Sequence, residues 1–91
     1  MAHIDISYPH DRSPEQTHQA IEQMAEKLRE KFSMKTHWEQ ETLRFSGIGI
    51  DGRIDLLPQQ VRVTAQLGFL LATLQDTITA EIKRELTEKL G

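Results

Sequence analysis

The stretch from Gly49 to Leu90 constrains the fold of this chain more than any other part of it. It contains a tight-turn signal, Asp51-Gly52, and then short runs in which apolar and polar residues alternate. An unbroken apolar patch, Leu67-Gly68-Phe69-Leu70-Leu71, separates these runs from a strongly amphipathic segment. A period of two is typical of half-buried strands, and a period near 3.6 is typical of a helix with one apolar face. The order therefore predicts short strands followed by a helix.

The last helix is predicted from apolar residues that recur every three or four positions between residues 71 and 90. Thr73, followed three residues later by Asp76, predicts the start of this helix. Three pairs of opposite charge are spaced as helix neighbours: Glu81 with Arg84, Arg84 with Glu88, and Glu85 with Lys89. Each such pair is expected to contribute only ~0.2–0.5 kcal/mol.

The first half of the chain shows the same two patterns. Apolar and polar residues alternate over residues 3–8, which predicts a strand that ends at Pro9. Ser13-Pro14-Glu15-Gln16 predicts a helix start, because Ser13 suits the N-cap, proline suits the first helical position and Gln16 completes a capping box. One apolar stripe follows along this helix: Ile21, Met24, Ala25, Leu28 and Phe32.

Four further strands are predicted between the two helices. Alternating runs lie at about 34–39, 42–46, 53–56 and 60–67. We expect a two-residue hairpin turn at Asp51-Gly52, since both residues tolerate the positive φ of a type I′ turn. Successive strands with short turns pair as antiparallel neighbours. Residues 1–91 are thus predicted to form a single α+β domain of order β-α-β-β-β-β-α, an antiparallel sheet with both helices on one face.

Length, charge and composition exclude several classes of protein. Ninety-one residues suffice for one domain with a modest core, since a chain of this size buries only about 60–65% of its unfolded surface. The net charge of −3 argues against nucleic acid as a partner, because phosphate binding needs a clustered basic surface. The chain has no cysteine, which excludes disulfides and thiolate metal sites. We expect no secretory signal and no membrane span, and therefore a cytoplasmic location.

Motifs with chemical associations have structural explanations here. Residues 47–52 match G-x-G-x-x-G, but they lie between two predicted strands, whereas a dinucleotide-binding loop joins a strand to a helix. The glycines of a bulged hairpin explain this motif better. The four histidines lack metal-ligand spacing, and Ser46, Asp51 and Asp55 form no catalytic set. We therefore assign no catalytic residue, no cofactor and no metal.

The apolar patch has more than one explanation. Burial in the core is the preferred one for Phe69, Leu70 and Leu71. If these residues are partly exposed, they are candidates for contact with an apolar ligand, a hydrophobic surface or a second copy of the chain. Trp38 and Phe45 are the expected aromatic walls of such a site. These five residues are therefore the candidate apolar contact.

Several segments of the chain resemble one small family. They are Asp51-Gly52-Arg53-Ile54, Val61-Arg62-Val63, Leu67 to Leu71, Ile78…Glu81-Ile82…Glu85-Leu86 and, in the first half, Pro9-His10, Trp38-Glu39 and Leu43-x-Phe45. On these residues the chain resembles the polyhydroxyalkanoic acid system family, often described as granule-associated proteins. The likeness extends over nearly the whole chain and its shared residues are mostly structural. Thr73 stands where a proline is expected in relatives, which affects only the helix start.

The resemblance implies a place in bacterial storage-polyester metabolism, in a cytoplasm that contains polyhydroxyalkanoate inclusions and on or near their surface. The order of elements also resembles a pared-down version of the helix-grip fold of START-type lipid-binding domains. The family offers no catalytic residue to carry over to this chain. The leading hypothesis is a non-enzymatic accessory protein that binds the granule, a granule protein or itself as a homodimer through apolar contacts.

Two alternatives follow from the same resemblance. The first is a small binder of hydroxyacyl or fatty acyl ligands, in a cavity between the sheet and the C-terminal helix. The second is an enzyme that acts on such acyl groups. If the apolar patch is buried within one chain, the docking surface is expected on the outer face of the sheet, near Arg44, Arg53 and Arg62.

Overall fold

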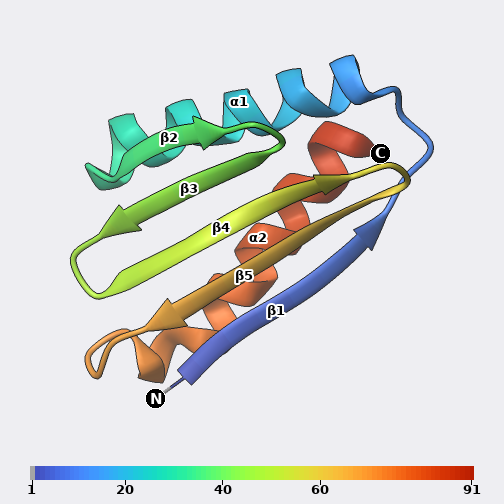
Figure 1. Cartoon of the computed structure of the whole chain (residues 1–91). Helices are drawn as coiled ribbons and strands as arrows, with labels where there is room; N and C mark the ends of the chain where they lie inside the picture. The colour runs from blue at the N-terminus through green and yellow to red at the C-terminus, as the bar shows by residue number, and fades with distance from the viewer. Residues whose placement is uncertain (1) are drawn as a thin grey trace.

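The computed structural model describes residues 2–91, which form a five-stranded antiparallel sheet and two helices (Figure 1). In chain order the elements are β1 (Ala2–Pro9), α1 (Pro14–Phe32), β2 (Lys35–Glu39), β3 (Thr42–Gly47), β4 (Ile50–Leu57), β5 (Gln60–Leu67), the short 3₁₀ helix η1 (Ala72–Leu74) and α2 (Gln75–Leu90). This confirms the predicted α+β class and the order β-α-β-β-β-β-α.

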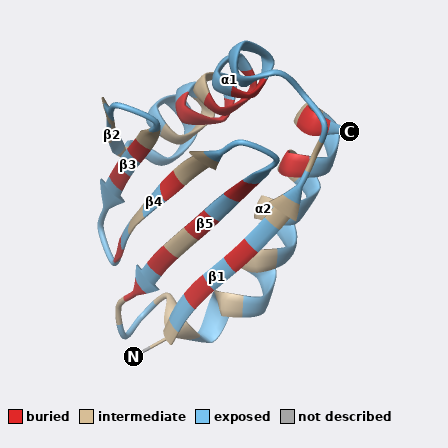
Figure 2. Cartoon of the chain, turned by 45° about the vertical axis from the view of Figure 1, so that its right-hand side comes forward, coloured by how far each residue is buried: buried red, intermediate tan, exposed pale blue. Residues whose placement is uncertain are grey.

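The strands lie in the order β1-β5-β4-β3-β2. Strands β2 to β5 follow one another through short turns, so each pairs with the next. Helix α1 carries the chain across the sheet from β1 at one edge to β2 at the other. Strand β1 then pairs with β5, from Ala2 opposite Leu67 to Pro9 opposite Gln60. Both helices lie on the same face of the sheet (Figures 1 and 2).

The core lies between this face and the helices. Buried and exposed residues alternate along the strands, as a half-buried sheet requires (Figure 2). The fully buried side chains come from every layer: Ile21 from α1, Leu43, Val61, Val63 and Leu67 from the sheet, and Leu86 from α2. Burial of each aliphatic side chain of this kind contributes about 1.5–3 kcal/mol.

The two helices are buried to different extents. The start of α1 has the predicted capping box: Ser13 Oγ accepts from Gln16 N, and Gln16 Oε1 accepts from Ser13 N. Its apolar stripe is buried from Thr17 to Ala25 but leaves the sheet further on, so Phe32 is 61% exposed. Helix α2 is buried only near its C-terminal end, at Leu86 and Leu90 (Figure 2).

The predicted hairpin turn at Asp51-Gly52 is wrong. The turn between β3 and β4 is Ile48-Gly49, where Gly49 has a φ of +81°, and Asp51 and Gly52 lie inside β4. A side chain at Gly52 has no room, because a Cβ there meets the ring of Phe45 at 2.7 Å and the Cβ of Ala65 at 2.8 Å. The expected bulge is also absent from this hairpin, whose register is continuous.

The predicted start of the last helix is also wrong. Helix α2 begins at Gln75, after η1, and no side chain caps its N-terminus. The hydroxyl of Thr73 donates instead to the carbonyl oxygen of Leu70 at 3.3 Å. Of the three predicted charge pairs, the structure contains Glu81 with Arg84. Glu85 reaches across to α1 rather than along its own helix.

Candidate functional site

The two helices diverge over the sheet. Helix α1 packs on β2, β3 and β4, whereas α2 packs mainly on β1. The C-terminal end of α2 lies beside α1, and its beginning lies near the start of β1, away from α1 (Figure 1). The middle of the sheet is therefore left between two helical walls.

An apolar pocket of about 300 Å³ opens in this gap. Its floor is the sheet, and its walls are the last turns of α1 and the first turns of α2. The lining residues are Met24, Leu28, Phe32, Met34, Phe45, Ile50, Ile54, Val63, Leu71, Leu74, Ile78, Glu81 and Ile82. All but Glu81 are apolar. Pockets of this size and lining are typical of sites for small apolar ligands.

Exposed apolar side chains gather at one end of the molecule. Ile48, in the β3–β4 turn, is fully exposed, while Phe69 and Leu70, between β5 and η1, are 89% and 78% exposed. The two loops are joined, because Gly68 N donates to Gly49 O at 2.8 Å. We call Ile48, Phe69 and Leu70 the apolar tip. The expectation that this patch belongs to the core is therefore wrong for Phe69 and Leu70.

The predicted contact residues lie in three different places. Phe45 and Leu71 line the apolar pocket, and Phe69 and Leu70 belong to the apolar tip. Trp38 lies outside both, with its ring stacked on His18 of α1 at a centroid distance of 4.0 Å. The sequence did not single out the helical walls of the pocket, such as Leu28 and Ile78. Their signal is the apolar stripe of each helix, which looks the same whether the stripe is covered or not.

Glu81 is the charged residue of the pocket lining, and Arg84, Lys27 and Lys31 lie near it. Lys27 Nζ of α1 lies 3.0 Å from both carboxylate oxygens of Glu85 of α2, which ties the two helices together. The hydrogen bond from Arg84 lowers the pKa of Glu81, and the nearby charges of Arg84, Lys27 and Lys31 lower it further. Glu81 is therefore an ionised carboxylate at neutral pH.

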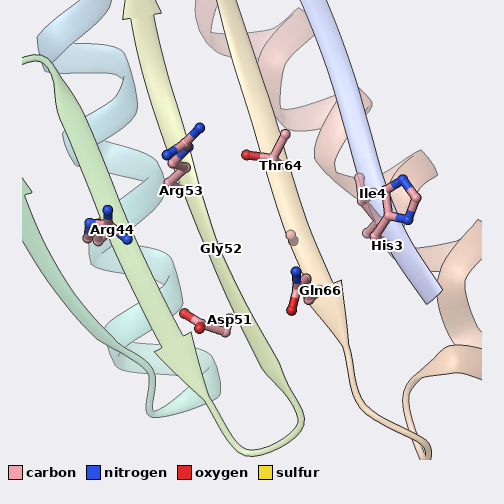
Figure 3. A pocket seen from close by; sticks show the side chains of 9 residues that line it. His3, Ile4, Arg44, Asp51, Gly52, Arg53, Thr64 and Gln66 are labelled. Atoms are coloured by element: carbon pink, nitrogen blue, oxygen red, sulfur yellow. The ribbon is translucent and has the colours of Figure 1, made fainter. Parts of the chain in front are cut away.

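A second, polar depression of about 400 Å³ lies on the outer face of the sheet, over Gly52 (Figure 3). Arg44 and Arg53 are direct cross-strand partners there, a pairing of like charges that is unfavourable by itself. Each has a carboxylate beside it: Glu39 accepts a hydrogen bond from Arg44, and Asp55 lies 3.3 Å from Arg53. The bond from Arg44 lowers the pKa of Glu39. On this solvated face both arginines are therefore paired with carboxylates.

Residues 2–91 contain no group of three or more side chains placed to hold a metal ion. Within the same range no helix has the length and apolar character to cross a membrane. Comparison with protein families gives a match to the model of the polyhydroxyalkanoic acid system proteins over residues 4–90. Neither the curated proteins nor the solved structures give a match. The predicted likeness to the helix-grip fold therefore stays a prediction.

Proposed function

Because the chain belongs to the polyhydroxyalkanoic acid system family, we propose that it is a non-enzymatic accessory protein of polyester storage that binds the granule surface through its apolar tip. The support comes from Ile48, Phe69 and Leu70, which a monomer gains nothing by exposing to water. Contiguous exposed apolar side chains mark sites of interaction. Neither of the segments that carry them, residues 46–50 and 67–75, contains a charged residue.

The shape of the tip suits contact with a hydrophobic surface. It lies at one end of the sheet, so it can enter an apolar phase while the core stays intact. The bond from Gly68 to Gly49 already pairs two of its backbone groups, which lowers the cost of removing water from them. Each apolar side chain that enters contributes about 1.5–3 kcal/mol, so three give reversible rather than permanent attachment.

Fractionation of polymer-producing cells tests this function. We expect the wild-type protein to sediment with granules, and the double variant Phe69→Ser/Leu70→Ser to lose at least about tenfold of that enrichment. Leu57→Ser is the matched control, because Leu57 is an exposed apolar residue in β4 at the opposite end of the sheet. Wild-type protein that stays wholly in the soluble fraction contradicts the proposal.

Purified polyester particles free of protein identify what the tip contacts. Binding of the wild type, and not of the double variant, supports direct contact with the polymer. Binding to native granules alone shows that a granule protein is the partner instead. Sedimentation of the free protein detects the remaining case, a homodimer that the double variant dissociates.

A second candidate function is favoured by the pocket between the helices. Its apolar lining of about a dozen residues suits a small binder of hydroxyacyl or fatty acyl ligands. A ligand that binds only the folded chain raises its melting temperature. We expect acyl ligands to produce such a rise, and no change at saturating ligand speaks against this function.

A further inference from the structure

We propose that the apolar pocket holds a single unbranched, uncharged aliphatic segment of about ten carbons, with its polar end outside at the rim. The proposal rests on the second candidate function and specifies its ligand. The length follows from the volume of about 300 Å³. A methylene group is about as large as a water molecule, for which ~30 Å³ is the volume in the liquid.

The lining excludes other occupants. Ordered water needs two to four polar partners, and the pocket offers only Glu81, whose carboxylate is already bonded to Arg84. An inserted peptide segment would leave its own amide and carbonyl groups without partners. A charged group would lose its hydration with no counter-charge inside. An aliphatic chain has no such groups, and it recovers the dispersion contacts that an empty pocket lacks.

The pocket stays open because α2 is fixed at both of its ends, with its start away from α1 and its end beside α1. At its start, Gln75 Nε2 donates to the carbonyl oxygen of His3 in β1 at 2.9 Å. At its end, Arg12 Nε donates to the carbonyl oxygen of Leu90 at 3.1 Å. The bond to His3 holds the start of α2 on the β1 side of the sheet, so this part of the helix does not slide toward α1 and cover Ile54 and Val63 on the floor.

The pocket opens next to the apolar tip. Phe32 and Leu74, which line it, are 61% and 48% exposed and form its rim. Leu71, also in the lining, packs against Gly49 in the turn between β3 and β4. A Cβ added to Gly49 would lie 3.4 Å from the side chain of Leu71. The lining thus adjoins the turn that carries Ile48 of the apolar tip, and an aliphatic chain has only a short path from a hydrophobic phase into the pocket.

Calorimetric titration of the full chain with primary alcohols of increasing length tests the proposal. Alcohols are uncharged, so chain length alone varies. We expect affinity to rise about fourfold with each methylene and to level off at about ten carbons. Absence of binding, or affinity that continues to rise well past that length, overturns the proposal.

Two variants of α2 locate the binding site. Ile78→Trp fills the pocket and is expected to weaken binding of the ten-carbon alcohol at least about tenfold. Ile82→Ala removes three carbons from the lining and is expected to move the plateau to chains about three carbons longer. The second result does not depend on whether the tryptophan variant folds. A plateau that stays in place in Ile82→Ala contradicts the assignment.

The double variant of the tip separates this proposal from granule docking. Phe69→Ser/Leu70→Ser leaves the lining intact, so its alcohol affinity is expected to match that of the wild type. Loss of granule enrichment in this variant, with alcohol binding retained, assigns the two activities to two surfaces. An acyl ligand that binds equally well to Ile78→Trp overturns the pocket assignment and leaves the second candidate function standing.

Discussion

The ammonium group of Lys27 in α1 lies 3.0 Å from both carboxylate oxygens of Glu85 in α2. In the described part of the chain it is the one ion pair that joins the helices. The side chain of Glu85 is only 13% exposed, whereas that of Lys27 is 42% exposed, so water screens the pair in part. Glu85 lies one helical turn beyond Glu81, the charged residue of the pocket lining.

We expect Lys27→Met and Glu85→Gln each to lower the free energy of unfolding by about 0.5–1 kcal/mol. For a domain of this size, that corresponds to a fall in melting temperature of about 2–8 °C. A double-mutant cycle, measured by denaturant unfolding, isolates the pairwise energy. The control is the pair Glu81–Arg84, which lies on the exposed surface of α2, and whose removal is expected to change little. A coupling energy of zero for Lys27 and Glu85 contradicts the prediction.

Gly52 is expected to tolerate no side chain. A Cβ there lies 2.5 Å from the carbonyl oxygen of Thr64 in the neighbouring strand, and a paired backbone does not move aside. Gly52→Ala should therefore lower the free energy of unfolding by about 1–3 kcal/mol or more. Gly47→Ala is the matched control, since the nearest atom to its Cβ is the flexible side chain of Met34, at 3.0 Å. Equal stability of the two variants argues against the observed register.

The position of this hairpin shows where sequence reasoning was sufficient and where it failed. The alternation of residues 42–46 and 53–56 predicted two paired strands correctly. The turn chemistry of Asp51-Gly52 placed the turn wrongly, because burial outweighed local preference. A turn there would leave Ile48 and Ile50 on the outer face together, whereas the observed turn exposes Ile48 and buries Ile50.

The candidate site was less accessible from the sequence. Apolar stripes predicted both helices and the face that each turns toward the sheet. They do not give the distance between the helices. That distance depends on long-range contacts such as Gln75–His3 and Arg12–Leu90, whose partners are separated by 72 and 78 positions in the sequence. The pocket exists because of that distance. The exposure of Phe69 and Leu70 was not predicted for a related reason. An apolar run in a sequence looks the same whether it forms the buried end of a strand or an exposed loop.

The stability of the β2 edge is expected to depend on pH through Glu22. Its carboxylate accepts from Trp38 Nε1 at 2.8 Å and from Arg29 Nη2 at 2.9 Å, and these bonds lower its pKa below the ordinary value of 4.5. Because the pKa is lower in the folded state, the stabilisation is complete above pH 4.5. It is lost as the pH falls through the folded pKa.

Glu22→Gln removes this titration. At neutral pH we expect the variant to be less stable by about 1 kcal/mol at most, since the site is partly exposed. Below pH 4.5 the difference from the wild type should shrink, because the wild-type carboxylate then takes up a proton. Urea unfolding of both proteins at several pH values measures this difference in the free energy of unfolding. Other carboxylates, such as Asp5, titrate equally in both proteins and cancel. A difference that grows on acidification contradicts the assigned direction.

A larger side chain that fills the pocket is expected to raise the stability of the fold and to weaken ligand binding. Leu28 lies half-buried in the α1 wall, so a larger ring at this position points into the unfilled volume. We expect Leu28→Phe to raise the free energy of unfolding by about 0.5–2 kcal/mol, as cavity-filling changes commonly do, and to weaken binding of the ten-carbon alcohol. Phe32→Leu is the comparison, since it trims an exposed residue of the rim and should alter stability little. Loss of stability in Leu28→Phe would show that the helices close over the sheet in solution and leave no pocket to fill.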